Sequence, residues 1–102
     1  QDFIFKGYKG DVKCAGRANA ELMMTPEHRF QKRHFDLYVG CRLIKENPYI
    51  VQIWGYASRE DLEKYGYIDD FGYGLTRCYR LKNLHAIIEL RNLKAKVENR
   101  KE

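Results

Sequence analysis

The chain has 102 residues, of which 44% are hydrophobic and 32% are charged, and its formal net charge at pH 7 is +5. This length accommodates one domain with a modest core and excludes a second core, while the positive charge favours a polyanionic partner without identifying it. The sequence shows neither an apolar run of about 18 residues, which a membrane span needs, nor a secretory leader. We therefore expect a soluble protein without a membrane partner.

The cysteines of the chain, Cys14, Cys41 and Cys78, are widely spaced, and none belongs to a C-x-x-C pair. Their odd number and their spacing predict reduced thiols and an intracellular, cytoplasmic protein. Each cysteine falls within a segment that we expect to be a strand, where cysteine most often acts as a small buried apolar residue.

The beginning of the chain predicts a β-hairpin. Residues 3–5 form an apolar strand, a turn with glycine at both ends spans residues 7–10, and residues 11–14 alternate between polar and apolar. Because alternate residues of a strand share a face, we expect Asp11 and Lys13 to project together and their neighbours to point to the opposite face.

This hairpin would place Asp2 near Asp11 across the strand pair. Two carboxylates so close repel each other unless a cation lies between them, and we expect this repulsion to raise their pKa values when no metal is bound. An oxygen-only ligand set favours Mg²⁺ or Mn²⁺ over zinc. The alternative interpretation is an exposed hairpin edge with solvated charges, which prevents strand-to-strand aggregation and needs no catalysis.

Asp2, a short spacer and the triplet Asp11-Val12-Lys13 together resemble the signature of the PD-(D/E)XK nuclease superfamily, which has the restriction-endonuclease-like fold. Stretches 49–62 and 70–84 are similar to small phage-type members. In those proteins a strand ends in a Gly-Tyr turn, a short capped helix follows, and a last strand leads into a leucine-rich helix. The chain departs from the family at Gln1, where the family has proline, and we expect the family's upstream acidic helix to precede Gln1 in a longer chain.

The segment after the first hairpin, residues 17–25, is ambiguous between helix and strand, and we favour a strand at 21–24. Thr25 and Pro26 then predict the start of a helix, with threonine as its cap. The densest basic run of the chain follows, and it is interpreted either as a solvated face or as a phosphate-contact patch. Its place beside the candidate site favours phosphate contact by Arg17, Arg29, Lys32 and Arg33.

A second hairpin is predicted from a strand at residues 35–44, a turn at 45–48 and a strand at 49–56. The near-continuous apolar character of the second of these strands suggests a central position, covered on both faces. We therefore expect Trp54 to lie in the core.

The last part of the chain predicts further regular elements. Ser58 and an acidic residue three positions later predict a capped helix, and the Asp69-Asp70 pair predicts a turn stabilised by its own side chains. A last strand is expected at residues 76–81. It is followed by an amphipathic helix from residue 83 to about residue 97.

The order of these elements predicts an α+β (α/β-like) fold with a mixed central β-sheet flanked by helices, in a single domain over residues 1–102. The resemblance implies a restriction-endonuclease-like core, shortened at its amino end. It implies that Asp2, Asp11 and the carbonyl of Val12 bind Mg²⁺ or Mn²⁺, and that Lys13 orients or activates the attacking water.

The function implied is metal-dependent hydrolysis of DNA phosphodiester bonds, and a homodimer is a further expectation. Two alternatives stay open. One is a nucleic-acid-binding module that keeps the fold without catalysis. The other is a phage structural or accessory module that binds protein through exposed aromatic residues.

Overall fold

The structure of the chain is a computed structural model that describes residues 2–15, 21–72 and 74–95. Strands, short α-helices and 3-10 helices alternate along these residues. In chain order they are β1 (Asp2–Phe5), β2 (Tyr8–Ala15), β3 (Leu22–Pro26), α1 (Glu27–Lys32), β4 (Leu37–Glu46), β5 (Tyr49–Ser58), α2 (Arg59–Tyr65), β6 (Tyr67–Asp70), β7 (Leu75–Arg80), η1 (Leu81–Asn83) and η2 (Ile87–Asn92).

The strands form two sheets. One is a four-stranded mixed sheet in the order β1-β2-β4-β5, in which β2 and β4 run parallel and the other neighbours run antiparallel. The other is a three-stranded antiparallel sheet in the order β3-β7-β6. The predicted α+β class with a mixed sheet is confirmed. The single central sheet is not, because β3, β6 and β7 pair with one another instead of joining the first sheet.

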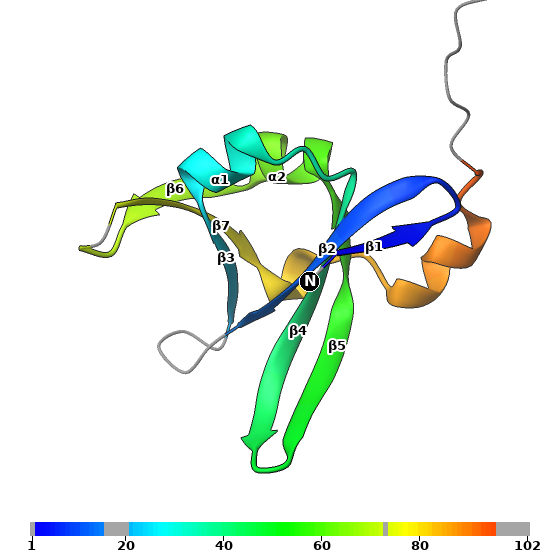
Figure 1. Cartoon of the computed structure of the whole chain (residues 1–102), viewed down its shortest axis with the longest axis horizontal. Coiled ribbons are helices and arrows are strands. Elements are labelled where there is room, and N and C mark those ends of the chain that lie inside the picture. The colour runs from blue at the N-terminus through cyan, green and yellow to red at the C-terminus, as the bar shows by residue number, and fades with distance from the viewer. Residues whose placement is uncertain (1, 16–20, 73, 96–102) are drawn as a thin grey trace, which may run out of the picture.

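The two helices and both sheets share one core. Figure 1 shows α1 and α2 near each other over the strands, and both helices contact β7. Apolar side chains from all these elements meet there, and they lose contact with water, which is the main favourable term in folding. The buried cluster consists of Ala15, Met23, Phe30, Phe35, Tyr38, Ala57, Leu62, Tyr79 and Leu81.

Arg77 of β7 ties both helices to the second sheet. Its Nε and Nη2 donate to the two carboxylate oxygens of Glu27 at 2.7 and 2.9 Å, and its Nη1 donates to the carbonyl of Leu62 at 3.0 Å. The centre of the Phe30 ring lies 4.5 Å from the guanidinium carbon of Arg77 and 4.1 Å from that of Arg59. The hydrogen bonds from Arg77 also hold the pKa of Glu27 below its ordinary value.

The predicted capped helix is confirmed in α2. The Oγ of Ser58 accepts a hydrogen bond from the Asp61 backbone N–H, and the Asp61 carboxylate accepts one from the Ser58 N–H, both at 3.0 Å. The same carboxylate lies 2.9 Å from Nε2 of His85, which fastens the segment between η1 and η2 to the helix start. Asp69 and Asp70, the pair expected to form a turn, are instead the last residues of β6, and the Asp70 carboxylate accepts a hydrogen bond from the Gly72 N–H just after the strand at 2.8 Å.

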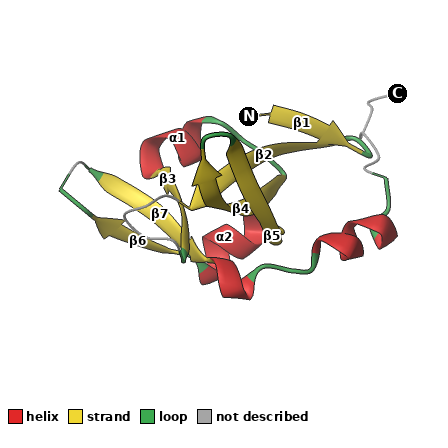
Figure 2. Ribbon diagram, turned by 90° about the horizontal axis from the view of Figure 1, so that it is seen from below, coloured by secondary structure: helices red, strands yellow, loops and turns green. Residues whose placement is uncertain are grey.

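Several predictions about the second hairpin and the C-terminal segment are wrong. Strand β5 is an edge strand, not a central one, and Trp54 is 40% exposed. Figure 1 shows the β4–β5 hairpin projecting away from the rest of the molecule. The expected long helix from residue 83 is replaced by η1 and η2, of which η2 lies at the opposite end of the molecule from the β6–β7 hairpin (Figure 2). Residues 96 and 97 of that expected helix lie outside the described ranges.

A helix long and apolar enough to cross a membrane is absent from the part of the chain that the structure describes.

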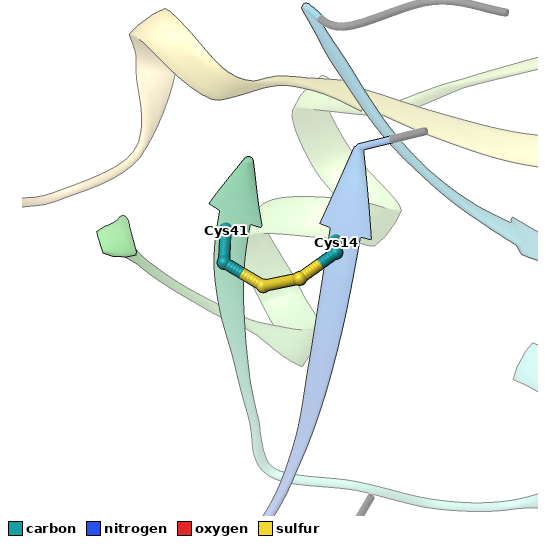
Figure 3. The surroundings of a disulfide bond; sticks show 2 residues. All are labelled: Cys14 and Cys41. Atoms are coloured by element: carbon teal, nitrogen blue, oxygen red, sulfur yellow. A yellow bond between two sulfur atoms is a disulfide. The ribbon is translucent and has the colours of Figure 1, made fainter. Parts of the chain in front are cut away.

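The prediction that all three cysteines are reduced is wrong. Cys14 of β2 and Cys41 of β4 form a disulfide bond, and Figure 3 shows it bridging the two neighbouring strands. The parallel register places these two residues directly opposite each other, although 27 positions separate them in the sequence. Cys78 is a buried free thiol, as expected for a small apolar residue.

Replacing Arg77 with methionine is expected to lower the free energy of unfolding by about 3 kcal/mol, because it removes the cation paired with the largely buried Glu27 carboxylate and one donor to the Leu62 carbonyl. Chemical denaturation at neutral pH measures this difference. The matched control is Arg29→Met on the exposed face of α1, which should change stability by less than about 0.5 kcal/mol. Equal effects of the two substitutions would show that Arg77 does not join the elements energetically.

Reducing the disulfide is expected to destabilise the fold by about 3–4 kcal/mol, the chain-entropy value for a loop of this length. Thermal melts with and without a phosphine reductant measure the effect. The double variant Cys14→Ser and Cys41→Ala serves as the control, since its melting temperature should be low and should not respond to reductant. A parent protein that melts identically in both conditions contradicts this expectation.

Candidate functional site

The β1–β2 hairpin fixes the relative positions of the two candidate carboxylates. Its turn consists of Lys6 and Gly7, both with positive φ (51° and 86°), a conformation that tight two-residue hairpin turns require. The turn therefore lies earlier than the predicted segment at residues 7–10, most of which belongs to β2. The resulting register pairs Asp2 with Asp11, as predicted. Directly opposed residues of an antiparallel pair share a face, so both carboxylates lie on the same side of the sheet.

Lys13 lies two residues beyond Asp11 on β2 and shares its face. Its Nζ is 3.2 Å from Oδ2 of Asp11, and Asp11 is only 4% exposed. A carboxylate this buried is stable in its charged form only with a partner of opposite charge. Lys13 is one such partner, so the predicted Asp11–Lys13 proximity is present in the folded chain.

Asp2 has a cationic neighbour from the basic run. Arg33 follows α1 directly, and its Nη2 lies 3.3 Å from Oδ2 of Asp2, with both side chains about half exposed. The residues Arg33, Asp2, Asp11 and Lys13 thus form a row in which each carboxylate has its own cation. We call this row the charge row.

For Asp11, the structure corrects the expectation that repulsion between the carboxylates raises its pKa. Burial by itself would raise the pKa of Asp11, but hydrogen bonds and nearby positive charge hold it below the ordinary aspartate value. Lys13 supplies both a hydrogen bond and a positive charge. Asp11 is therefore ionised at neutral pH. Its charge contributes to folding stability instead of opposing it.

Asp2 and Asp11 present carboxylate oxygens on one face of the hairpin, and oxygen is the ligand type that hard divalent cations prefer. Val12, whose carbonyl is the third expected ligand, lies between Asp11 and Lys13 in the sequence of β2. A cation bound there would compete with Lys13 and Arg33 for the two carboxylates. Among the described residues, no group of three or more His, Cys, Asp or Glu side chains is gathered in a way that could hold a metal ion.

Two buried polar groups that the sequence did not single out belong to Tyr38 and Arg59. Tyr38 of β4 is the register partner of Asp11, and burial, with a smaller effect of the Asp11 charge, raises the pKa of its phenol. Within the described ranges, neither the hydroxyl of Tyr38 nor Nη1 of Arg59 has a hydrogen-bond partner. Alternation of side chains along β4 could have predicted that Tyr38 faces the core. Nothing in the sequence indicates that Asp11 is its neighbour on β2.

The rest of the basic run stays at the surface. Arg29 and Lys32 are exposed on α1, close in sequence to Arg33 at the charge row. Arg17, the remaining predicted phosphate contact, lies outside the described residues. The structure therefore brings one of the four predicted phosphate contacts, Arg33, to the candidate site.

No known protein family, curated protein or solved structure matches the chain. The site is therefore assigned from its own geometry.

Replacing Asp11 with asparagine is expected to lower stability at pH 7, because it leaves Lys13 without its buried partner. The pKa of Asp11 is lower in the folded chain than in the unfolded chain. The stability that its charge contributes is therefore present above the unfolded pKa of about 3.9 and is lost as the pH falls toward the folded pKa. The difference between parent and variant should therefore shrink below about pH 4. Thermal melts of the two proteins between pH 2 and roughly pH 8 measure it, a range that brackets the ordinary aspartate pKa.

The control for this measurement is Asp2→Asn, which removes a half-exposed carboxylate and should change stability by less than about 1 kcal/mol. An Asp11→Asn variant that melts at or above the parent temperature at pH 7 would show that repulsion between the carboxylates outweighs the Lys13 pair.

Proposed function

We propose that this protein is a metal-dependent nuclease that hydrolyses DNA phosphodiester bonds at the charge row. The observation that carries the proposal is the strand register that sets Asp2 opposite Asp11, with the Lys13 Nζ 3.2 Å from Asp11. Asp2, Asp11 and Lys13, the three residues on which the resemblance to PD-(D/E)XK nucleases rests, lie on one face, and this supports the proposal.

Other segments support a restriction-endonuclease-like core as part of the same proposal. Strand β5 passes through Gly55 and Tyr56 and is followed by the capped helix α2, in the order of the phage-type pattern. Strand β7 then leads into the leucine-containing η1 segment, although this segment is a 3-10 helix instead of a long α-helix.

Each residue of the charge row has a proposed role. Asp2, Asp11 and the Val12 carbonyl would hold Mg²⁺ or Mn²⁺, which supplies Lewis-acid polarisation of the phosphate and a bound water of lowered pKa. Lys13 would keep a positive charge beside the reacting phosphate and offset the negative charge that develops there. Arg33 would exchange its contact with Asp2 for a contact with the DNA backbone, because a guanidinium binds carboxylate and phosphate by the same donors.

The remaining cations of the basic run, Arg17, Arg29 and Lys32, would bind the DNA backbone without reading its sequence. The proposed location is the cytoplasm. That location requires the Cys14–Cys41 bond to persist against cytosolic reductants, which keep most thiols of intracellular proteins reduced.

A second function is favoured by a specific observation. Both carboxylates of the charge row already have cationic partners, so the row is electrostatically balanced without a metal. A nucleic-acid-binding module without catalysis would show the same balance. Metal-dependent cleavage separates the two functions.

Purified protein is expected to nick plasmid DNA with Mg²⁺ or Mn²⁺, and Lys13→Ala should slow this by about 10²–10³-fold, the typical effect of removing one electrostatic donor from an active site. Gel assays of supercoiled DNA over time measure the rate. Lys9→Ala is the matched control, because Lys9 lies on the same strand and is exposed, so cleavage should be unchanged. Parent protein that leaves plasmid, linear and single-stranded DNA intact with either metal would overturn the proposal in favour of the binding module.

A further inference from the structure

A second candidate site lies away from the charge row, where the β4–β5 hairpin meets the end of the β3–β7 pair. It is a cavity of about 200 Å³. The backbone closes it on one side, since the Leu81 N–H donates to the Glu21 carbonyl at 3.0 Å and Leu22 pairs with Arg80. The described residues that line the cavity are Glu21, Arg42, Trp54, Arg80, Leu81 and Lys82.

A β-bulge brings Trp54 to this cavity. Gly40 pairs with Gly55 and Cys41 pairs with Ile53, so Trp54 is the extra residue of β5 and has no register partner. Bulges commonly redirect a side chain in this way. The indole Nε1 donates to the Gln52 side chain at 3.2 Å, and Gln52 is the register partner of Arg42. The indole therefore lies on the same face of the hairpin as the Arg42 guanidinium.

The chemistry of the lining suits an anion attached to a flat ring. Arg42, Arg80 and Lys82 supply three cationic side chains against the single carboxylate of Glu21. The partly exposed face of Trp54 offers a stacking surface, and a guanidinium nearby adds a cation–π contact with a stacked ring. Pockets for whole drug-sized ligands typically measure roughly 300–1,000 Å³, so a cavity of about 200 Å³ suits a single planar group.

We propose that this cavity binds one unstacked nucleotide of a single-stranded nucleic acid, with its base on Trp54 and its phosphates on Arg42, Arg80 and Lys82. The β2–β4 register is unbroken from Gly10 to Ala15, so Arg42, opposite Ala15, shares a sheet face with Lys13. The choice of nucleic acid over other polyanions rests on the proposed function. Binding itself does not require catalysis.

Trp54 is the sole tryptophan of the chain, so its fluorescence reports directly on this cavity. Titrating the protein in EDTA with an oligothymidylate is expected to quench the tryptophan emission in a saturable way. An abasic oligonucleotide of the same length and charge should quench much less, because it lacks the ring that stacks. Thymidine monophosphate is the probe for a free nucleotide and should bind far more weakly than the oligonucleotide.

Substitutions test the same contacts with a labelled oligothymidylate, whose anisotropy does not depend on tryptophan. Trp54→Ala should weaken binding by about 5- to 150-fold, the range measured for loss of one stacked base, while Trp54→Phe should retain most of the affinity. Tyr49→Ala, which removes an exposed aromatic of the same hairpin outside the cavity, is the control and should bind like the parent. Replacing Arg42 and Arg80 with glutamine should reduce the slope of log affinity against log salt by about 1.4.

Equal quenching by the abasic oligonucleotide, equal affinity of the Trp54→Ala variant, or equally tight binding of polyglutamate would each overturn the inference. Thymidine monophosphate that binds as tightly as the oligonucleotide would overturn the assignment to a strand. Cleavage of DNA without quenching would overturn the nucleotide site in this cavity and leave the nuclease proposal intact. Quenching without cleavage would support the nucleotide site and overturn the nuclease proposal.

Discussion

The guanidinium group of Arg77 is the contact on which the arrangement of this domain depends, because it joins elements that no strand pairing connects. From β7 it binds Glu27 at the start of α1 and the Leu62 carbonyl of α2, and it lies against the Phe30 ring. A largely buried cation is stable there because its donors have well-placed acceptors and because Glu27 neutralises its charge. With α1 held in this way, the chain that leaves the helix brings Arg33 to Asp2.

The charge row depends on a second constraint, the register of the first hairpin. A slip of one residue between β1 and β2 would turn Asp2 to the opposite face and separate it from Asp11. The two-residue turn prevents such a slip, since its positive φ values fit a tight hairpin and Gly7 adopts them without strain. The bond between Cys14 and Cys41 then joins β2 to β4 next to Lys13. The strand that carries both Asp11 and Lys13 is thus fixed on each of its sides.

The charge row and the cavity beside Trp54 differ in their balance of positive and negative side chains. In the charge row each carboxylate is already paired, so a ligand or metal must displace an existing contact. In the cavity three cations face a single carboxylate, so an anion finds an excess of positive charge. The first arrangement is consistent with the proposed metal site. The second is consistent with the proposed binding of a nucleic-acid backbone and one base.

The sequence by itself determined the features that depend on neighbouring residues. Alternation within β2 placed Asp11 and Lys13 on one face, and the Ser58 capping box predicted α2, because both follow from contacts over a few positions. Only the tertiary structure decided three other features. They are the disulfide between Cys14 and Cys41, the pairing of Tyr38 on β4 with Asp11 on β2, and the exposure of Trp54 on the β4–β5 hairpin. Each of these features depends on which distant strands pair and which faces stay exposed. The residues of a single strand do not determine that pairing.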